Sequence, residues 1–137
     1  MKRTLLLLAA MIILPSCHST ADQRTAYFKV AGATEADTFV IALTDPATVA
    51  EARALASGQE PSKHVTGLVV AEAVPYNAPW RFHLDPASIS FAEMSIEVCD
   101  AATSYVEEHL ADVGGAFLPG RRWCPWSSRV VEEVDVQ

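Results

Sequence analysis

Two cysteines, Cys99 and Cys124, constrain the fold of this chain more than any other feature of its sequence. The third cysteine, Cys17, belongs to an N-terminal segment that we expect to be processed. In an oxidising compartment, the two remaining thiols favour a single disulfide. Such a bond would close a loop of about 25 residues and stabilise the fold by roughly 3 kcal/mol on the loop-entropy estimate. A pair of buried free thiols is the alternative.

The N-terminus has the three parts of a secretory signal peptide. Lys2 and Arg3 supply positive charge, Leu5–Leu14 is an unbroken apolar run, and small residues follow. The run is short for a transmembrane helix, and it lacks the polar face that a core helix would show. We therefore predict that residues 1–16 are a signal peptide and that the protein is exported.

The residues at the end of this segment, Leu14–Cys17, resemble the lipobox of bacterial lipoproteins. In that family the cysteine is lipidated and becomes the new N-terminus, so the resemblance implies a lipid on Cys17 and a place in the cell envelope. The alternative is cleavage after Ala21 by ordinary signal peptidase, which would give a soluble secreted protein. In either case the polar residues 17–25 are predicted to be a tether.

The acidic composition argues against some partners. The formal net charge is −7 at pH 7, and removal of Lys2 and Arg3 would make it more negative. Nucleic-acid binding needs a positive footprint, so we expect no nucleic-acid partner. An acidic surface is not attracted to anionic lipids either, so we expect membrane attachment only through a lipid on Cys17.

Residues 26–137 are long enough for one small domain, and alternation, turns and caps divide them into short elements. Helices are predicted after the caps Asp45 and Asp100. Strands are predicted at residues 27–30, 38–43, 64–74, 80–84, 92–98 and 129–134. This order predicts an α+β fold: a mainly antiparallel sheet of five to six strands with two helices on one face, in a ferredoxin-like arrangement with additions.

Three residues are candidates for catalysis. His83 and Asp85 share a strand face, and such a pair can orient an imidazole as a general base. Cys124 could act as a nucleophile, with Arg121 and Arg122 favouring its thiolate. A disulfide explains Cys124 more simply, and a solvated strand face explains the other pair, so we assign no catalytic residue. The cysteines and histidines lack the spacing of metal ligands, and we expect no metal or cofactor.

The segment GRRWCPWSSR at residues 120–129 gathers aromatic and basic side chains in an acidic chain. Pro125 excludes a regular interior strand, so a loop that caps the core is the structural interpretation. An exposed cluster of Trp and Arg is also typical of a binding hot spot. The two tryptophans cannot face inward equally, and we expect one in the core and one exposed. The candidate binding residues are Trp80, Arg121, Arg122, Trp123 and Trp126.

Four blocks of sequence carry a resemblance to a known family: TFVIALTDP at 38–46, VPYNAPWRFHLDP at 74–86, IEVCDA at 96–101 and YVEEHLADVGGAFLPGRRWCPWSSR at 105–129. They resemble the N-terminal-domain family first named from a eukaryotic calmodulin-binding protein, across about residues 26–134. The resemblance implies a small extracellular-type domain and brings no catalytic residues. We do not expect calmodulin as a partner, because its targets are usually basic amphipathic helices and residues 100–113 are acidic.

The sequence therefore predicts an exported domain, lipid-anchored or secreted, that is not an enzyme. It is expected to bind a protein or small-molecule partner at the cell envelope or outside the cell. Two alternatives remain. One is a small hydrolase that uses His83, Asp85 or Cys124, and the other is a secreted protease inhibitor with a rigid proline-containing loop.

Overall fold

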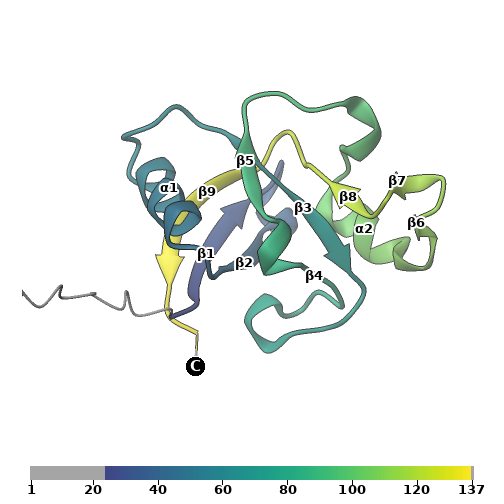
Figure 1. Ribbon diagram of the computed structural model, residues 1–137. Coiled ribbons are helices and arrows are strands. Elements are labelled where there is room, and N and C mark those ends of the chain that lie inside the picture. The colour runs from purple at the N-terminus through teal and green to yellow at the C-terminus, as the bar shows by residue number, and fades with distance from the viewer. Residues whose placement is uncertain (1–23, 137) are drawn as a thin grey trace, which may run out of the picture.

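The computed structural model describes residues 24–136 of the chain (Figure 1). The predicted signal peptide, the lipidation site Cys17 and nearly all of the predicted tether lie outside these residues, and they stay predictions. Within the described part, no helix is both long enough and apolar enough to cross a membrane.

Three antiparallel strands form one sheet, in the order β2-β1-β9. They are β1 (Ala26–Ala31), β2 (Phe39–Leu43) and β9 (Arg129–Val134). Burial alternates along β1, because every second side chain of a strand points to the same face. Phe28 and Val30 are completely buried on that face. The predicted hairpin of β1 and β2 and the predicted last edge strand are confirmed.

A second sheet is built around β3 (His64–Val70), which pairs with three short strands along its length. These are β4 (His83–Leu84), β5 (Ser90–Ala92) and β8 (Arg122–Trp123), all antiparallel to β3. A short parallel pair, β6 (Val113–Gly114) and β7 (Phe117–Pro119), lies apart from both sheets. The strands are thus divided among several sheets instead of the single one expected, and neither strand order is the ferredoxin-like one.

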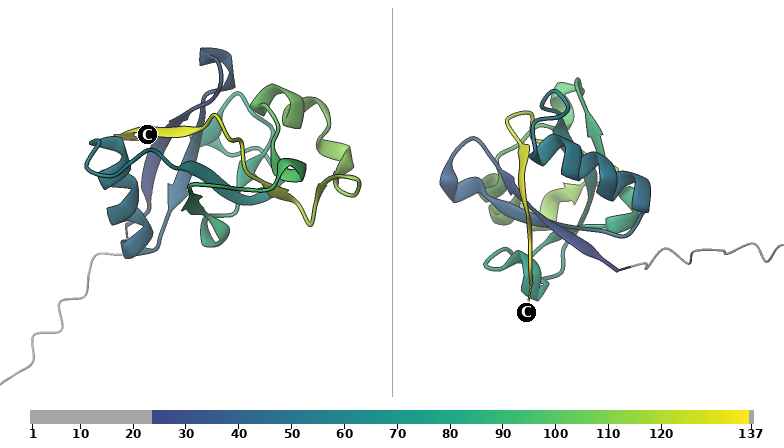
Figure 2. Two further views of the ribbon diagram at one scale, coloured as in Figure 1. Left: turned by 90° about the horizontal axis from the view of Figure 1, so that it is seen from above. Right: turned by 90° about the vertical axis from the view of Figure 1, so that its left-hand side faces the viewer.

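Two helices complete the α+β fold, as predicted, but they do not share a face. Helix α1 (Pro46–Ala56) begins after Asp45, whose carboxylate accepts a hydrogen bond from the Thr48 N–H at 2.8 Å. It packs against β9 and β2. Helix α2 (Thr103–Glu108) lies at the opposite end of the molecule (Figures 1 and 2). Single 3-10 turns occupy much of the rest: η1 (Glu35–Asp37), η2 (Pro75–Asn77), η3 (Pro86–Ser88), η4 (Glu97–Cys99) and η5 (Leu110–Asp112).

One continuous hydrophobic core joins the two sheets and α1. Trp123 is completely buried in it and packs against Phe39 and Phe82, with ring centroids 4.8 and 5.6 Å away. Its indole N–H donates to the Ala101 carbonyl at 2.9 Å. Because a buried indole needs a partner for its N–H, this bond allows the largest side chain of the domain to sit at the centre.

Candidate functional site

A disulfide between Cys99 and Cys124 joins the middle of the chain to its C-terminal part. The two Cα atoms are 5.2 Å apart, and the Cys124 N–H donates to the Cys99 carbonyl at 2.8 Å. Next to it, the Trp126 N–H donates to the Asp100 carboxylate at 2.9 Å. The predicted disulfide is present, and it brings the segment that follows β5 against the segment between β8 and β9, both at the top of Figure 1.

Asp100 therefore does not cap the second helix as expected. That helix begins only at Thr103, after Ala102, and ends at Glu108. Because the Asp100 carboxylate accepts the Trp126 N–H, it holds the loop of Trp126 in place instead.

The two tryptophans of this loop have opposite environments, as expected from their spacing. Trp123 is 0% exposed, whereas Trp126 is 47% exposed. A side chain without accessible surface has no area to offer a partner. Of this pair, only Trp126 remains a candidate for direct binding.

The segment at residues 93–98 is the largest departure from the sequence prediction. It was expected to continue a half-buried strand, but β5 ends at Ala92. The reason is the register: Ala92 pairs with His64, the first residue of β3, so no neighbouring backbone remains to pair with the residues that follow. The apolar side chains expected in the core are exposed instead: Met94 at 87%, Ile96 at 69% and Val98 at 52%.

A pocket of about 320 Å³ opens between this segment and Trp126. It is lined by His64, Glu93, Met94, Ser95 and Trp126. His64 Nε2 and Ser95 Oγ are in hydrogen-bond contact. Burial lowers the pKa of His64 from its ordinary 6.5, and the negative charge of Asp100 opposes part of this effect. At neutral pH the imidazole at this pocket is therefore uncharged.

The other candidate binding residues do not join Trp126 at this pocket. Trp80 is half-buried, and its indole N–H donates to the Thr38 carbonyl at 2.8 Å. Arg121 follows Gly120 in a turn where both residues have positive φ, 63° and 65°. The guanidinium of Arg122 donates to Thr66 Oγ1 at 3.3 Å. These contacts are typical of residues that hold loops onto the core.

The residues considered for catalysis are also separated. His83 Nδ1 lies 2.8 Å from the Glu72 carbonyl oxygen, and the Asp85 carboxylate accepts the Ala87 N–H at 3.0 Å. Both groups thus stabilise local turns, and the expected His–Asp pairing is not formed. Cys124 has no free thiol, because its sulfur is in the disulfide.

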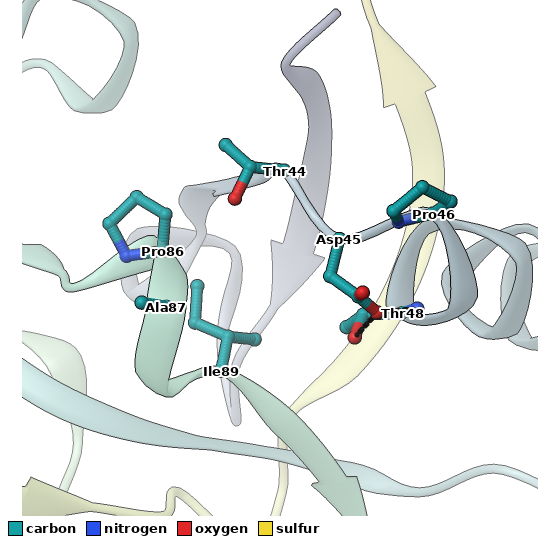
Figure 3. A pocket seen from close by; sticks show the side chains of 7 residues that line it. All are labelled: Thr44, Asp45, Pro46, Thr48, Pro86, Ala87 and Ile89. Atoms are coloured by element: carbon teal, nitrogen blue, oxygen red, sulfur yellow. Dashed lines mark hydrogen bonds between the residues drawn. The ribbon is translucent and has the colours of Figure 1, made fainter. Parts of the chain in front are cut away.

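Two further cavities lie on other surfaces. The first, of about 670 Å³, is where Asp45 and Thr48 meet the turn that contains Pro86 (Figure 3). Its main polar group is already satisfied, because the Asp45 carboxylate accepts both the N–H and the hydroxyl of Thr48 at 2.8 Å. The second, of about 450 Å³, lies beside the stacked rings of Tyr105 and His109.

Neither cavity is flanked by several exposed apolar side chains as the pocket of Trp126 is. Among residues 24–136, no group of three or more His, Cys, Asp or Glu side chains is arranged to hold a metal ion. The pocket of Trp126 is therefore the best candidate site in the described part of the chain.

The fold and this site define a small α+β domain in which a disulfide holds an exposed apolar loop against a tryptophan. The chain belongs to the N-terminal-domain family first named from a eukaryotic calmodulin-binding protein, and the sequence model of that family matches residues 24–137. The family resemblance carried by the sequence blocks is thus confirmed. No curated protein and no solved structure matches the chain significantly.

Sequence reasoning found one member of the site, Trp126, and missed the others. The apolar residues Met94, Ile96 and Val98 were recognised, but their alternation was interpreted as a buried strand face. His64 and Ser95 carried no signal, because they are far apart in sequence and meet only through the register of β3 and β5.

Proposed function

We propose that this protein is an exported, non-enzymatic domain that binds a protein or small-molecule partner through a surface made of Met94, Ile96, Val98 and Trp126. We refer to these four side chains as the Trp126 surface. One observation carries the proposal: all four are large, apolar and about half or more exposed. Single exposed apolar residues are common, but a group of them beside a pocket is typical of interaction sites.

The supports of this surface favour binding with little rearrangement. The disulfide fixes the end of the 93–98 segment, and the bond from the Trp126 N–H to Asp100 fixes the neighbouring loop. A surface held in its binding conformation loses less entropy when a partner binds. The sequence evidence for export and for a lipid on Cys17 places this surface outside the cytoplasm in the proposal.

Selection from a random display library of peptides on the purified protein tests this function. We expect enriched peptides to bind the wild type and to lose binding to the double variant Met94→Ser/Trp126→Ser. The matched control is Val131→Ser/Val136→Ser, which removes two apolar side chains that are each 36% exposed elsewhere. If every binder is indifferent to the first variant, the Trp126 surface is not the site.

Hydrolysis is the second candidate function, and the contact between His64 Nε2 and Ser95 Oγ favours it. A neutral imidazole beside a hydroxyl is the arrangement that activates a serine nucleophile. A fluorophosphonate probe tests this candidate, because Ser95 Oγ would displace fluoride while His64 takes the hydroxyl proton. Labelling at Ser95 that disappears in His64→Gln would replace the binding proposal with hydrolysis, and we expect none.

A protease inhibitor is the third candidate, and it would use the same exposed 93–98 segment as its reactive loop. A panel of extracellular proteases of different specificity tests it. We expect no inhibition, because the proposal assigns this segment to a groove-like contact with Trp126 instead of insertion into a protease cleft.

A further inference from the structure

We propose that the Trp126 surface binds a peptide segment of a partner protein, one in which an apolar side chain is flanked by lysine or arginine. This inference rests on the proposed function and specifies the chemistry of its partner. It follows from three properties of the site: the size of the pocket, the sign of the charges around it and the exposed face of the indole.

The pocket volume of about 320 Å³ is at the lower end of the range for ligand sites. Such a volume suits one bulky side chain better than a large cofactor. Met94 and Trp126 supply apolar walls, and Ile96 and Val98 extend the apolar surface beyond the pocket. We therefore assign the pocket to one aliphatic or aromatic anchor, with neighbouring residues of the peptide lying along the 93–98 segment.

The charges around the pocket are of one sign. Residues 93–100 read EMSIEVCD, with three carboxylates and no basic residue. Glu93 lines the pocket itself, while Glu97 and Asp100 are exposed beside it. A partner must therefore bring positive charge next to its apolar anchor, or leave these carboxylates facing an apolar surface at a cost in free energy.

The nearest basic groups do not cancel this charge. Lys63 precedes His64 in the sequence, but its ammonium group donates to Glu51 at 2.7 Å and to Glu60 at 3.1 Å. His64 itself is neutral at pH 7, because burial lowers its pKa. The negative field at the pocket is thus available to a cationic partner, and it adds to the net charge of −7 on the whole chain.

The indole of Trp126 offers a second means of recognising a cation. It is 47% exposed, so part of its ring is accessible to solvent. Guanidinium and ammonium groups bind favourably over an indole face. Carboxylates and an indole side by side favour Arg or Lys over a neutral polar residue at the flanking positions.

The same charges disfavour other occupants of an apolar surface. A second copy of this chain would bring its own carboxylates to the contact, and an anionic membrane would be repelled. Nucleic acid is excluded for the same reason. A basic, apolar peptide is the occupant whose charge and shape both match.

Two matched pools of synthetic peptides test the inference by fluorescence polarisation. Both have an aliphatic or aromatic residue at the centre. One pool has Lys or Arg at the flanking positions, and the other has Gln there. We expect the basic pool to bind at least tenfold more tightly and to lose binding as salt is added, because salt screens exposed charges.

Variants then assign the binding to this surface. Trp126→Ser should weaken binding of the basic pool by roughly 30-fold or more, as expected for the loss of a hot-spot residue. Glu93→Gln/Glu97→Gln should weaken it about three- to tenfold, since an ion pair at an exposed position contributes little. The control Glu35→Gln/Glu108→Gln removes the same charge from exposed positions outside residues 93–100 and should have little effect.

Each other outcome overturns the inference in a recognisable way. Equal binding of both pools, still dependent on Trp126, would leave the proposed function standing and exclude a basic partner. Trp126-dependent self-association in sedimentation, or Trp126-dependent binding to phosphatidylcholine vesicles, would assign the surface to a second copy or to lipid. If neither pool binds through Trp126, a basic peptide is excluded, and the unrestricted display selection decides whether the surface binds anything.

Discussion

Trp123 and Trp126 lie three residues apart and should differ sharply in their contribution to stability. Trp123→Ala removes a completely buried ring from between Phe39 and Phe82, and we expect it to lower the free energy of unfolding by roughly 3–5 kcal/mol. Trp126→Ala removes an exposed ring and should cost about 0.5 kcal/mol or less. Urea unfolding of both variants measures the difference. Equal losses would show that Trp126 is a core residue and would remove it from the proposed site.

His64 should make stability depend on pH in a window that the carboxylates do not share. Burial lowers its pKa in the folded state, so the unfolded state, with an ordinary pKa of 6.5, binds the proton more readily. Stability therefore rises with pH through this window and falls as pH drops below about 6.5. The carboxylates of Asp37 and Glu133, whose pKa values are lowered by hydrogen bonds, lose their contribution only at more acidic pH.

Urea midpoints measured from pH 7.5 down to pH 5.5 check this prediction. The wild type should lose stability across the range, and His64→Gln should give a flatter profile, because Gln keeps a hydrogen-bonding group near Ser95 without titrating. Identical slopes for the two proteins would show that His64 is not the group responsible.

At the scale of single elements, the start of α1 depends on one carboxylate. Asp45 accepts the N–H and the hydroxyl of Thr48, and Pro46 occupies the first turn, where a missing N–H costs nothing. Asp45→Ala should destabilise the protein by about 1 kcal/mol, whereas Asp45→Asn should retain most of the stability because Asn is also a good cap. Thermal unfolding distinguishes them, and an equal loss in both variants would mean that charge, not capping, matters here.

The elements that were predictable are those whose signals are local. Asp45 and Pro46 lie next to the helix they begin, and the alternation of Phe28 and Val30 gives the buried face of β1 without further information. The fate of Asp100 was not predictable in this way, because its partner, the Trp126 N–H, is brought to it by the fold. Its local sequence is that of a helix cap, yet the helix begins later, at Thr103.

The site was the least predictable part for the same reason. Alternating apolar residues at 92–98 predict a strand, but a strand needs a neighbour, and β3 begins at His64. Nothing local to Met94 or Ile96 reports where β3 starts. The side chains that the pattern places in the core become the exposed surface on which our proposal for function rests.

At the scale of the whole molecule, the disulfide links two distant segments and should support both stability and binding. Cys99→Ser/Cys124→Ser should lower the free energy of unfolding by about 2–5 kcal/mol, the usual cost of losing a native disulfide in a small domain. It should also weaken binding at the Trp126 surface, because the bond fixes the end of the 93–98 segment. Intact mass before and after alkylation checks that the bond forms, and two free thiols in the native protein would contradict it.

The place of the whole protein depends on residues before the described domain, and Cys17 provides the test. If Cys17 is lipidated, the wild type should partition with membranes and Cys17→Ala should move to the soluble fraction. The domain itself offers no other attachment, because its net charge is negative and an anionic membrane does not attract it. Ser16→Ala, which keeps a small residue before the cysteine, is the matched control and should stay membrane-bound. A soluble wild-type protein that begins at Asp22 would instead show cleavage after Ala21, and the Trp126 surface would then act on a diffusing protein.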